Sequence, residues 1–186
     1  WFVGMVRITL AGIDHPSLSF GDVLSRPTLG KRSRDTFDCV MAVPPWRRLD
    51  KERSSASFEI ATTSSEGQFL QHIASSLRPG GRAVVALPEA FLFSAGSEKR
   101  VRKLLMEEYH VEGIVGLPSN VFKPYTSTES ALLVFRRAKP AEAVRFLRFE
   151  SVQGVGRGRD VVSGATALEV ARQFHERKSV ADTVWA

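Results

Sequence analysis

Two prolines followed by a tryptophan make the tetrapeptide Val43-Pro44-Pro45-Trp46 the sharpest chemical feature of this sequence. Proline has a fixed φ and no backbone N–H, so the carbonyls before and between the two prolines are held in place without a competing donor. Trp46 adds a wide apolar face beside those carbonyls. This set of groups suits a planar ring that carries an exocyclic amine. The alternative interpretation is a rigid strand end with a packed tryptophan.

Other candidate site residues follow apolar runs elsewhere in the chain, namely Asp22, the pair Pro88-Glu89 and the segment 118–125. Ligands of α/β sheets bind beyond the carboxyl ends of the strands, so we expect these segments to converge with the tetrapeptide. Glu89 is expected at the rim of that site rather than as a base. The four histidines lie far apart in the sequence and lack ligand spacing with Cys39, so no metal site is predicted.

The elements that must position these residues alternate between strand-length apolar runs and helical patterns, which is typical of an α/β fold. Strands are expected at 37–42, 82–88, 111–117, 130–136 and 143–149. The first should be buried, with Cys39 inert inside it, and the last should be an edge strand because Arg alternates with apolar residues. One helix is expected from a cap at Ser65 to Leu77, before a tight turn at 78–81, and a second from a cap at Ser97.

The two ends of the chain carry weaker patterns. A helix or loop is expected within residues 1–24, and a polar loop over 47–63. Four glycines predict a flexible loop over 154–164, before a helix near 167–178. The inward side of that helix is expected to consist of Leu168, Ala171 and Phe174.

Composition restricts the class of protein further. With 186 residues, 43% of them hydrophobic and 25% charged, the chain is predicted to form one globular domain. No apolar run approaches the roughly 18 residues that span a bilayer, so no membrane partner is expected. A lone cysteine cannot form an internal disulfide, which favours a cytoplasmic location. The net charge of +6 favours a polyanionic partner such as nucleic acid.

Several stretches resemble one known family. The sequence FDCVMAVPPW at 37–46 is similar to the Asn-Pro-Pro-aromatic segment of N6-adenine DNA methyltransferases. Three further stretches resemble the modification (M) subunit of type I restriction-modification systems. They are GQFLQHIASSLRPGGRAVVALPEAFLF at 67–93, SEKRVRKLLMEE at 97–108 and EGIVGLPSNVFKPYTSTESALLVF at 112–135. Residues 4–27 resemble the segment that ends in the acidic cofactor motif of the family. The resemblance therefore covers nearly the whole chain.

The resemblance implies a Rossmann-like fold with a mostly parallel twisted sheet flanked by helices. It also implies S-adenosylmethionine (SAM) as the methyl donor and a target adenine flipped out of double-stranded DNA. Asp22 matches the acidic residue that holds the adenine of the cofactor, and a carboxylate can accept a hydrogen bond from an amine. Val43 and Pro44 match positions that border both the cofactor and the reacting amine.

The same resemblance assigns the target-base site. Pro44 and Pro45 match the prolines of the catalytic motif, and Trp46 matches the aromatic residue that stacks on the flipped base. Phe122 is the first candidate for an aromatic on the other side of that base, and Tyr125 is the second.

Two departures from the family pattern bear on catalysis. Val43 stands where the family has asparagine, and valine has no acceptor for the target amine. The glycine-rich cofactor motif and the first strand of the family would precede Trp1, so we expect weak SAM binding. Either a fragment of a longer chain or a degenerate gene product accounts for this.

Domain, partner and function assignments follow from the resemblance. Residues 1–150 are expected to form a partial methyltransferase catalytic domain, and 151–186 a glycine-rich loop and C-terminal helix. Double-stranded DNA and the specificity and restriction subunits of a type I system are the implied partners, and self-association is left open. The expected function is SAM-dependent methyl transfer to adenine N6. Its rivals are an inactive methyltransferase-like module for DNA or subunit binding and, more weakly, a methyltransferase for RNA or protein glutamine.

Overall fold

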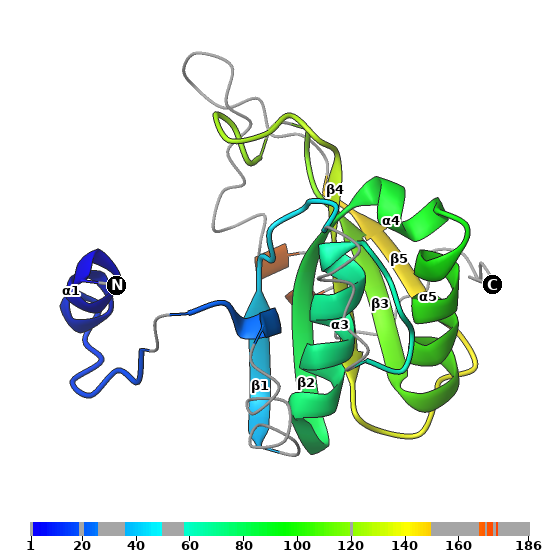
Figure 1. Ribbon diagram of the computed structural model, residues 1–186, viewed down its shortest axis with the longest axis horizontal. Helices are drawn as coiled ribbons and strands as arrows, with labels where there is room; N and C mark the ends of the chain where they lie inside the picture. Colours follow the sequence, from blue (N-terminus) through cyan, green and yellow to red (C-terminus); the bar gives the residue numbers. More distant parts are fainter. Residues whose placement is uncertain are drawn as a thin grey trace.

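A five-stranded sheet in the order β1-β2-β4-β3-β5 forms the centre of the molecule, with α3, α4 and α5 on one of its faces (Figure 1). It is seen in a computed structural model. That structure describes residues 2–18, 21–25, 36–49, 58–119 and 121–149, together with 168, 169, 171, 172 and 174. No helix in these parts of the chain is long and apolar enough to cross a membrane.

The elements follow the predicted alternation. The helices are α1 (Phe2–Leu10), the 3-10 helix η1 (Val23–Ser25), α3 (Ser65–Ser76), α4 (Glu89–Phe93) and α5 (Ser97–Glu108). The strands are β1 (Phe37–Ala42), β2 (Leu77–Pro88), β3 (His110–Gly116), β4 (Ser130–Arg136) and β5 (Arg145–Arg148). The short helix α4 was not anticipated. Figure 1 shows α1 standing apart from the sheet.

The sheet is mixed rather than mostly parallel. β1 runs parallel to β2, and β3 runs parallel to β5. β4 runs antiparallel to both of its neighbours, β2 and β3. The reason is the connection between β3 and β4, which returns through residues 117–129 without a crossover helix, so the strand must reverse. The α/β class is confirmed, and the expectation of a mostly parallel sheet is corrected.

The observed caps and ends of α3 and α5 differ in part from those predicted from the sequence. Ser64, not Ser65, caps α3, and its hydroxyl accepts the N–H of Gly67 at 3.2 Å. α5 begins at Ser97 after Gly96, without a side-chain cap. Leu77 starts β2 instead of ending α3, because it pairs with Phe37.

The expected tight turn at 78–81 is a bulge inside β2. The pairing with β1 jumps from Leu77 opposite Phe37 to Arg82 opposite Cys39. Gly80 has a φ of 80°, which only glycine adopts at little cost, and so permits the bulge.

β1 is an exposed edge strand, contrary to the expectation that it is buried. Among the described residues it pairs only with β2, so its outer edge and one face remain accessible. Cys39 is exposed and Met41 is 81% exposed, whereas Val40 and Ala42 pack against the core. The prediction of an inert, buried Cys39 is therefore wrong.

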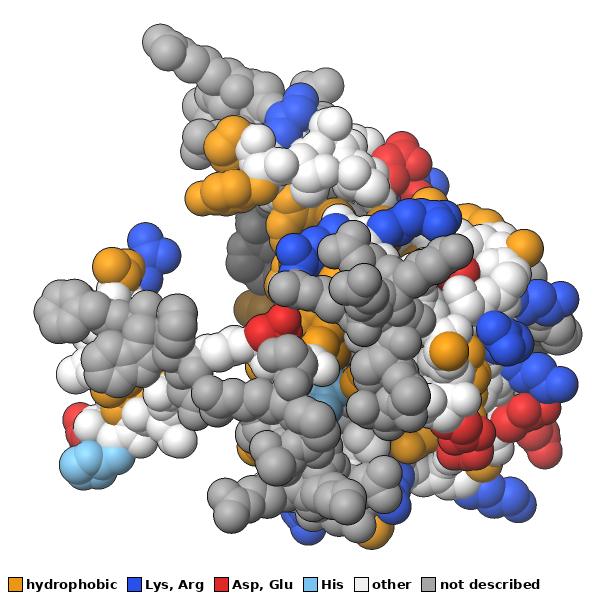
Figure 2. Space-filling view, viewed as in Figure 1, with side chains coloured by type: hydrophobic (Ala, Val, Ile, Leu, Met, Phe, Trp, Pro, Cys, Tyr) orange, Lys and Arg blue, Asp and Glu red, His pale blue; other side chains and the backbone are white. Residues whose placement is uncertain are grey.

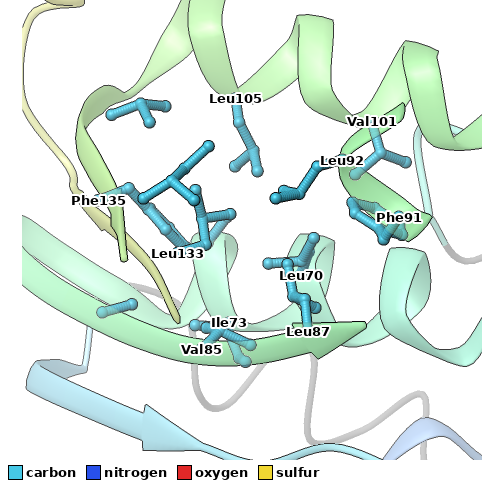
Figure 3. Close-up of a cluster of buried hydrophobic side chains, with 14 of the residues drawn as sticks. Leu70, Ile73, Val85, Leu87, Phe91, Leu92, Val101, Leu105, Leu133 and Phe135 are labelled. Carbon is cyan, nitrogen blue, oxygen red and sulfur yellow. The ribbon is translucent and has the colours of Figure 1, made fainter. Parts of the chain in front are cut away.

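The main core lies between the sheet and the helices of one face (Figure 3). It is built from alternate residues of β2 and β4 and from one side of α3 and α5, as the periods of strands and helices require. Its labelled members are Leu70, Ile73, Val85, Leu87, Phe91, Leu92, Val101, Leu105, Leu133 and Phe135. α3 begins at Ser65, β2 ends at Pro88 and α5 begins at Ser97, so the core fixes elements that carry residues of the site discussed below.

The C-terminal residues that the structure describes are helical, and Phe174 among them lies against β3 and β5. The guanidinium of Arg145 lies 5.5 Å from the ring centre of Phe174 and donates to its carbonyl. Leu168 and Ala171, expected to face inward, are exposed, so only Phe174 packs as predicted. The expected glycine-rich loop over 154–164 lies outside the described residues.

Replacing Gly113 by alanine is expected to lower the free energy of unfolding by about 1–3 kcal/mol, as overpacking does. An added Cβ would lie 2.7 Å from the carbonyl oxygen of Arg145 and 2.8 Å from the ring of Phe174. Gly116→Ala in the same strand is the control, because its Cβ would meet only the flexible side chain of Arg148, at 3.3 Å. Urea titration of both variants checks this, and equal losses of stability would contradict it.

Candidate active site at the end of the first strand

The tetrapeptide Val43-Pro44-Pro45-Trp46 follows β1 directly, where the sequence places it. β2 ends alongside at Pro88, which also precedes the first turn of α4. Pro44 is buried and Pro45 is exposed, while Val43 is 66% exposed. The two prolines thus lie in an irregular segment, one of them toward the protein and the other accessible.

Ser65, at the start of α3, holds the backbone at Pro45 and Arg47 by hydrogen bonds. Its fully buried hydroxyl donates to the carbonyl of Pro45 and accepts the N–H of Arg47 at 3.1 Å. Its own N–H donates to the carbonyl of Arg47 at 3.0 Å. The three bonds hold the residues on both sides of Trp46, which therefore has a fixed backbone.

The indole of Trp46 is fixed as well. Its Nε1–H donates to the carbonyl of Ala86 in β2 at 3.2 Å. The ring of Phe122 meets it edge to face, with centroids 5.3 Å apart and an angle of 88° between the planes. Because the rings are in direct contact, a base stacked between them requires Phe122 to move aside. The structure thus brings Phe122 to Trp46 but does not arrange the two as parallel walls.

A cavity of about 620 Å³ opens beside Trp46. Its lining combines an aromatic wall with charged and hydroxyl groups. It is lined by Trp46, Arg47, Arg48, Ser64, Glu66, Pro88, Ala90, Phe91, Ser94, Glu98, Tyr125, Thr126 and Thr128. Tyr125 is 93% exposed at its rim, and Figure 2 shows exposed hydrophobic side chains over the segment that joins β3 and β4.

Two carboxylates and two guanidinium groups set the charge of this cavity. Glu66 is buried and accepts the hydroxyl of Ser64 at 2.6 Å, whereas Arg47 and Arg48 are exposed. Glu98 lies in the first turn of α5. A polar ligand with both donors and acceptors, or an anionic chain passing the two arginines, matches this lining.

A half-buried arginine holds the α4 wall of the cavity in place. Arg102 of α5 donates through Nη1 to the carbonyl of Phe91 at 2.7 Å. Burial lowers the pKa of Arg102, and the carboxylate of Glu98 opposes that change. The bond joins α4 to α5 and so positions Phe91, which lines the cavity.

The predicted convergence is realised only in part. Trp46, Pro88 and Tyr125 line one cavity, whereas the other predicted site residues are not among its lining residues, namely Asp22, Val43, Pro44, Pro45, Glu89 and Phe122. Asp22 is exposed, and its carboxylate accepts the N–H of Leu24 at 3.0 Å at the start of η1, which lies beside α3. Within the described residues no group of three His, Cys, Asp or Glu side chains could hold a metal ion.

Sequence reasoning missed the residues of the polar loop and of the α3 N-terminus. The sequence predicts only a helix cap at Ser65 and indicates no role in the site for Arg47 or Glu66. The available signal was the stretch Ser64-Ser65-Glu66, in which more hydroxyl and carboxyl groups stand at one helix start than a single cap requires.

The structure is an α/β sheet with two prolines and an aromatic residue directly after β1 and a polar cavity beside them, and ligands of such sheets bind beyond the strand ends. Residues 2–182 match the family described as N-6 DNA Methylase, and the chain belongs to that family. This confirms the resemblance seen in the sequence.

Individual relatives agree. The chain is 34% identical over 152 residues to the type I restriction enzyme EcoEI methylase subunit of Escherichia coli. The matched region is 80% of this chain and 31% of that protein. A structure from a study of the assembly and conformational transition of the type I R-M system superimposes with a TM-score of 0.79 at 26% identity, over 91% of this chain and 35% of that one. The crystal structure of the EcoKI M protein superimposes with a TM-score of 0.62 at 24% sequence identity. That match covers 82% of this chain and 32% of the EcoKI M protein. The chain thus spans about a third of the length of these relatives.

Proposed function

We propose that this chain carries the target-base site of an adenine-specific DNA methyltransferase, as part of the modification subunit of a type I restriction-modification system. The observation that carries the proposal is the fixed indole of Trp46, which lines a polar cavity directly after the two prolines. An aromatic face that is already immobile loses little conformational entropy when a base stacks on it.

The backbone hydrogen bonds at Pro44 and Pro45 support a different role for each proline. The carbonyl of Pro45 is engaged by Ser65, whereas within the described part of the chain no donor reaches the carbonyl of Pro44. In this proposal Pro44 supplies the acceptor for the N6 amine of adenine, as the family motif implies, and the bond of Pro45 to Ser65 fixes the backbone beside it. Phe122 and Tyr125 would cover the base once Phe122 has moved from Trp46.

Asp22 would hold the adenine end of SAM in this proposal. Asp22 has an exposed carboxylate, the right group to accept the exocyclic amine of the cofactor, and its turn is fixed by Leu24. Val43 and Pro44 would border the cofactor near the target amine. When bound, SAM would supply the methyl group. Residues 43–46 would orient the N6 amine of the target adenine toward that group. Residues 1–150 would then be the catalytic part of the chain.

The proposed partners are double-stranded DNA and the specificity and restriction subunits of a type I system. The name of the EcoEI relative as a methylase subunit of a restriction enzyme supports this assignment. A net charge of +6 and the exposed arginines of the cavity support DNA as a ligand, and DNA would place the protein in the cytoplasm.

Trp46→Ala is expected to weaken binding of a duplex that carries an adenine opposite an abasic site by about 5- to 150-fold. The range corresponds to roughly 1–3 kcal/mol for base stacking on one aromatic side chain. Fluorescence anisotropy at low salt measures it. Phe93→Ala is the control, because Phe93 is an exposed aromatic on α4 outside the cavity lining. Equal affinities of the wild type and the Trp46 variant would exclude this indole as the stacking platform.

Binding to duplexes of unrelated sequence is expected to weaken about 100-fold between 50 and 200 mM salt, as a log–log slope of about −3 to −4 implies. Replacing both Arg47 and Arg48 by glutamine should reduce that slope by about 1–2, because each exposed arginine would release one counterion. Lys103→Gln on α5, where Lys103 pairs with Glu107 at 3.6 Å, should leave the slope unchanged. A slope that the double variant does not change would place the DNA backbone elsewhere.

A second candidate function is a module that binds DNA bases without catalysis. The observation that favours it is Val43, because its side chain offers no acceptor at the position where the family has asparagine.

A further inference from the structure

A base that enters the cavity beside Trp46 needs an acceptor for its exocyclic amine. The amine of adenine carries two N–H donors, and the side chain of Val43 can accept neither of them. Arg47 and Arg48, which line the cavity, are donors only. An amine that is buried without an acceptor loses its hydrogen bond to water, and this loss weakens binding. A site that prefers adenine therefore needs another acceptor in its lining.

Of the two carboxylates that line the cavity, Glu66 is the buried one. Only 8% of the residue is exposed, and it borders the same cavity as the indole of Trp46. One of its oxygens, Oε2, accepts the hydroxyl of Ser64 at 2.6 Å. Within the described residues no donor reaches the other oxygen, Oε1, and that atom is not fully buried. Oε1 can therefore accept a hydrogen bond from a ligand in the cavity.

Hydrogen bonds hold this carboxylate beside the backbone that carries Trp46. The hydroxyl of Ser65 donates to the carbonyl of Pro45 and lies 3.5 Å from Oε2 of Glu66. The indole is fixed in turn by its bond to β2. The carboxylate and the indole are thus held relative to each other through a single residue, Ser65. An acceptor that is already fixed loses little conformational entropy when it binds a donor.

The other polar side chains of the lining are less suited to this role. The hydroxyl of Ser64 already donates to Glu66. The hydroxyl of Thr126 donates to that of Thr128 at 2.8 Å. Glu98 is only partly buried, so water competes for its oxygens. Glu66 is therefore the acceptor whose bond to a base would be best shielded from water.

We infer that Glu66 accepts the exocyclic amine of the base that stacks on Trp46, and so determines that the site prefers adenine to a purine without the amine. The amine N–H donates to Oε1, while Oε2 stays with Ser64. Glu66 supplies this acceptor in a chain in which Val43 has none to offer. The inference rests on the proposed assignment of Trp46 as the base-stacking residue.

The expected preference for adenine over purine, which is adenine without its amine, is about 10- to 150-fold, the effect of one hydrogen bond to a charged group. Glu66→Gln keeps the size of the side chain. The hydroxyl of Ser64 still needs an acceptor, so the amide oxygen should stay with Ser64 and the amide NH₂ should face the base. Two donors then meet, and the preference should be lost. Glu66→Met, with an apolar side chain of similar size, should lose it too.

The test uses the whole 186-residue chain and two duplexes that differ only in one base. One carries adenine and the other purine, each opposite an abasic site, so that the loss of a base pair does not enter the comparison. Fluorescence anisotropy at fixed low salt gives Kd for the wild type and each variant. The ratio of the two Kd values is the readout, because a general change in DNA affinity or in stability cancels in it.

Two further variants complete the set. Glu107→Gln is the matched control, because it makes the same change in charge at an exposed position of α5, where Glu107 pairs with Lys103 at 3.6 Å. Trp46→Ala tests the base site itself. Circular dichroism shows which variants are folded, and either Glu66 variant alone decides the question if the other is not.

A preference of 10-fold or more that Glu107→Gln keeps and the Glu66 variants lose supports the inference. A smaller preference of the wild type, with Trp46→Ala weakening binding of both duplexes, overturns it and leaves the base site in place. A preference that survives in the Glu66 variants also overturns it, because another group then accepts the amine. If Trp46→Ala changes neither affinity, the proposed base site fails, and this inference fails with it.

Discussion

Phe135→Ala is expected to lower the free energy of unfolding by about 3–5 kcal/mol, as other truncations of buried phenylalanines do. Phe135 is fully buried in β4, at the middle of the sheet, and it is the largest of the fully buried side chains described. Its ring meets Tyr109 edge to face at 6.0 Å. Truncation would leave a cavity that strands on both sides of β4 hold open.

The matched control is Phe93→Ala, which removes the same atoms from a side chain that is 75% exposed. Its effect should stay within about 0.5 kcal/mol, the usual range for exposed positions. Denaturant unfolding of the three proteins, followed by circular dichroism, measures the difference. Similar losses in both variants would mean that the core does not lie between the sheet and α3 and α5.

Val43→Asn is expected to raise methyl transfer to adenine N6 by at least about 10-fold, and by up to about 150-fold, in the natural polypeptide that contains residues 1–186. One hydrogen bond to a group that becomes charged contributes about 1.5–3 kcal/mol. It accelerates the reaction only if it is stronger in the transition state, when positive charge develops on the amine nitrogen. Incorporation of labelled methyl groups from SAM into unmodified duplex measures the rate.

Val43→Leu is the control, since it has the size of asparagine without the acceptor and should remain at the wild-type rate. Adding Trp46→Ala to Val43→Asn should remove most of the gain. Equal rates with valine and asparagine would show that the reaction does not use this position. If no version transfers methyl groups, the binding module is the better description of the chain.

Strand positions were predictable because short apolar runs bounded by proline or polar residues leave few alternatives. β1 and β4 have the expected limits, Phe37–Ala42 and Ser130–Arg136. Their environment was not predictable from the same signal. An apolar run does not reveal which strands flank it, and so the exposure of Cys39 and the reversed direction of β4 depend on the tertiary arrangement.

The candidate site shows the same division. Trp46 and the prolines were found because their covalent chemistry restricts the backbone wherever they stand. The role of Ser65 could not be found in this way, since its bond to Pro45 joins residues 20 positions apart. Likewise the contact of Phe122 with Trp46 links segments 76 positions apart, and sequence alone could not distinguish a closed ring pair from an open one.

The exposed face and edge of β1 affect how the protein behaves in solution. Met41 and Phe37 are 81% and 46% exposed on a strand that pairs on one side only among the described residues. The unpaired backbone groups of such an edge can pair with another extended segment, and exposed apolar side chains stabilise that pairing. We therefore expect the purified chain to aggregate through β1 as its concentration rises, and Met41→Lys to reduce that aggregation because a charge on an edge strand opposes strand addition.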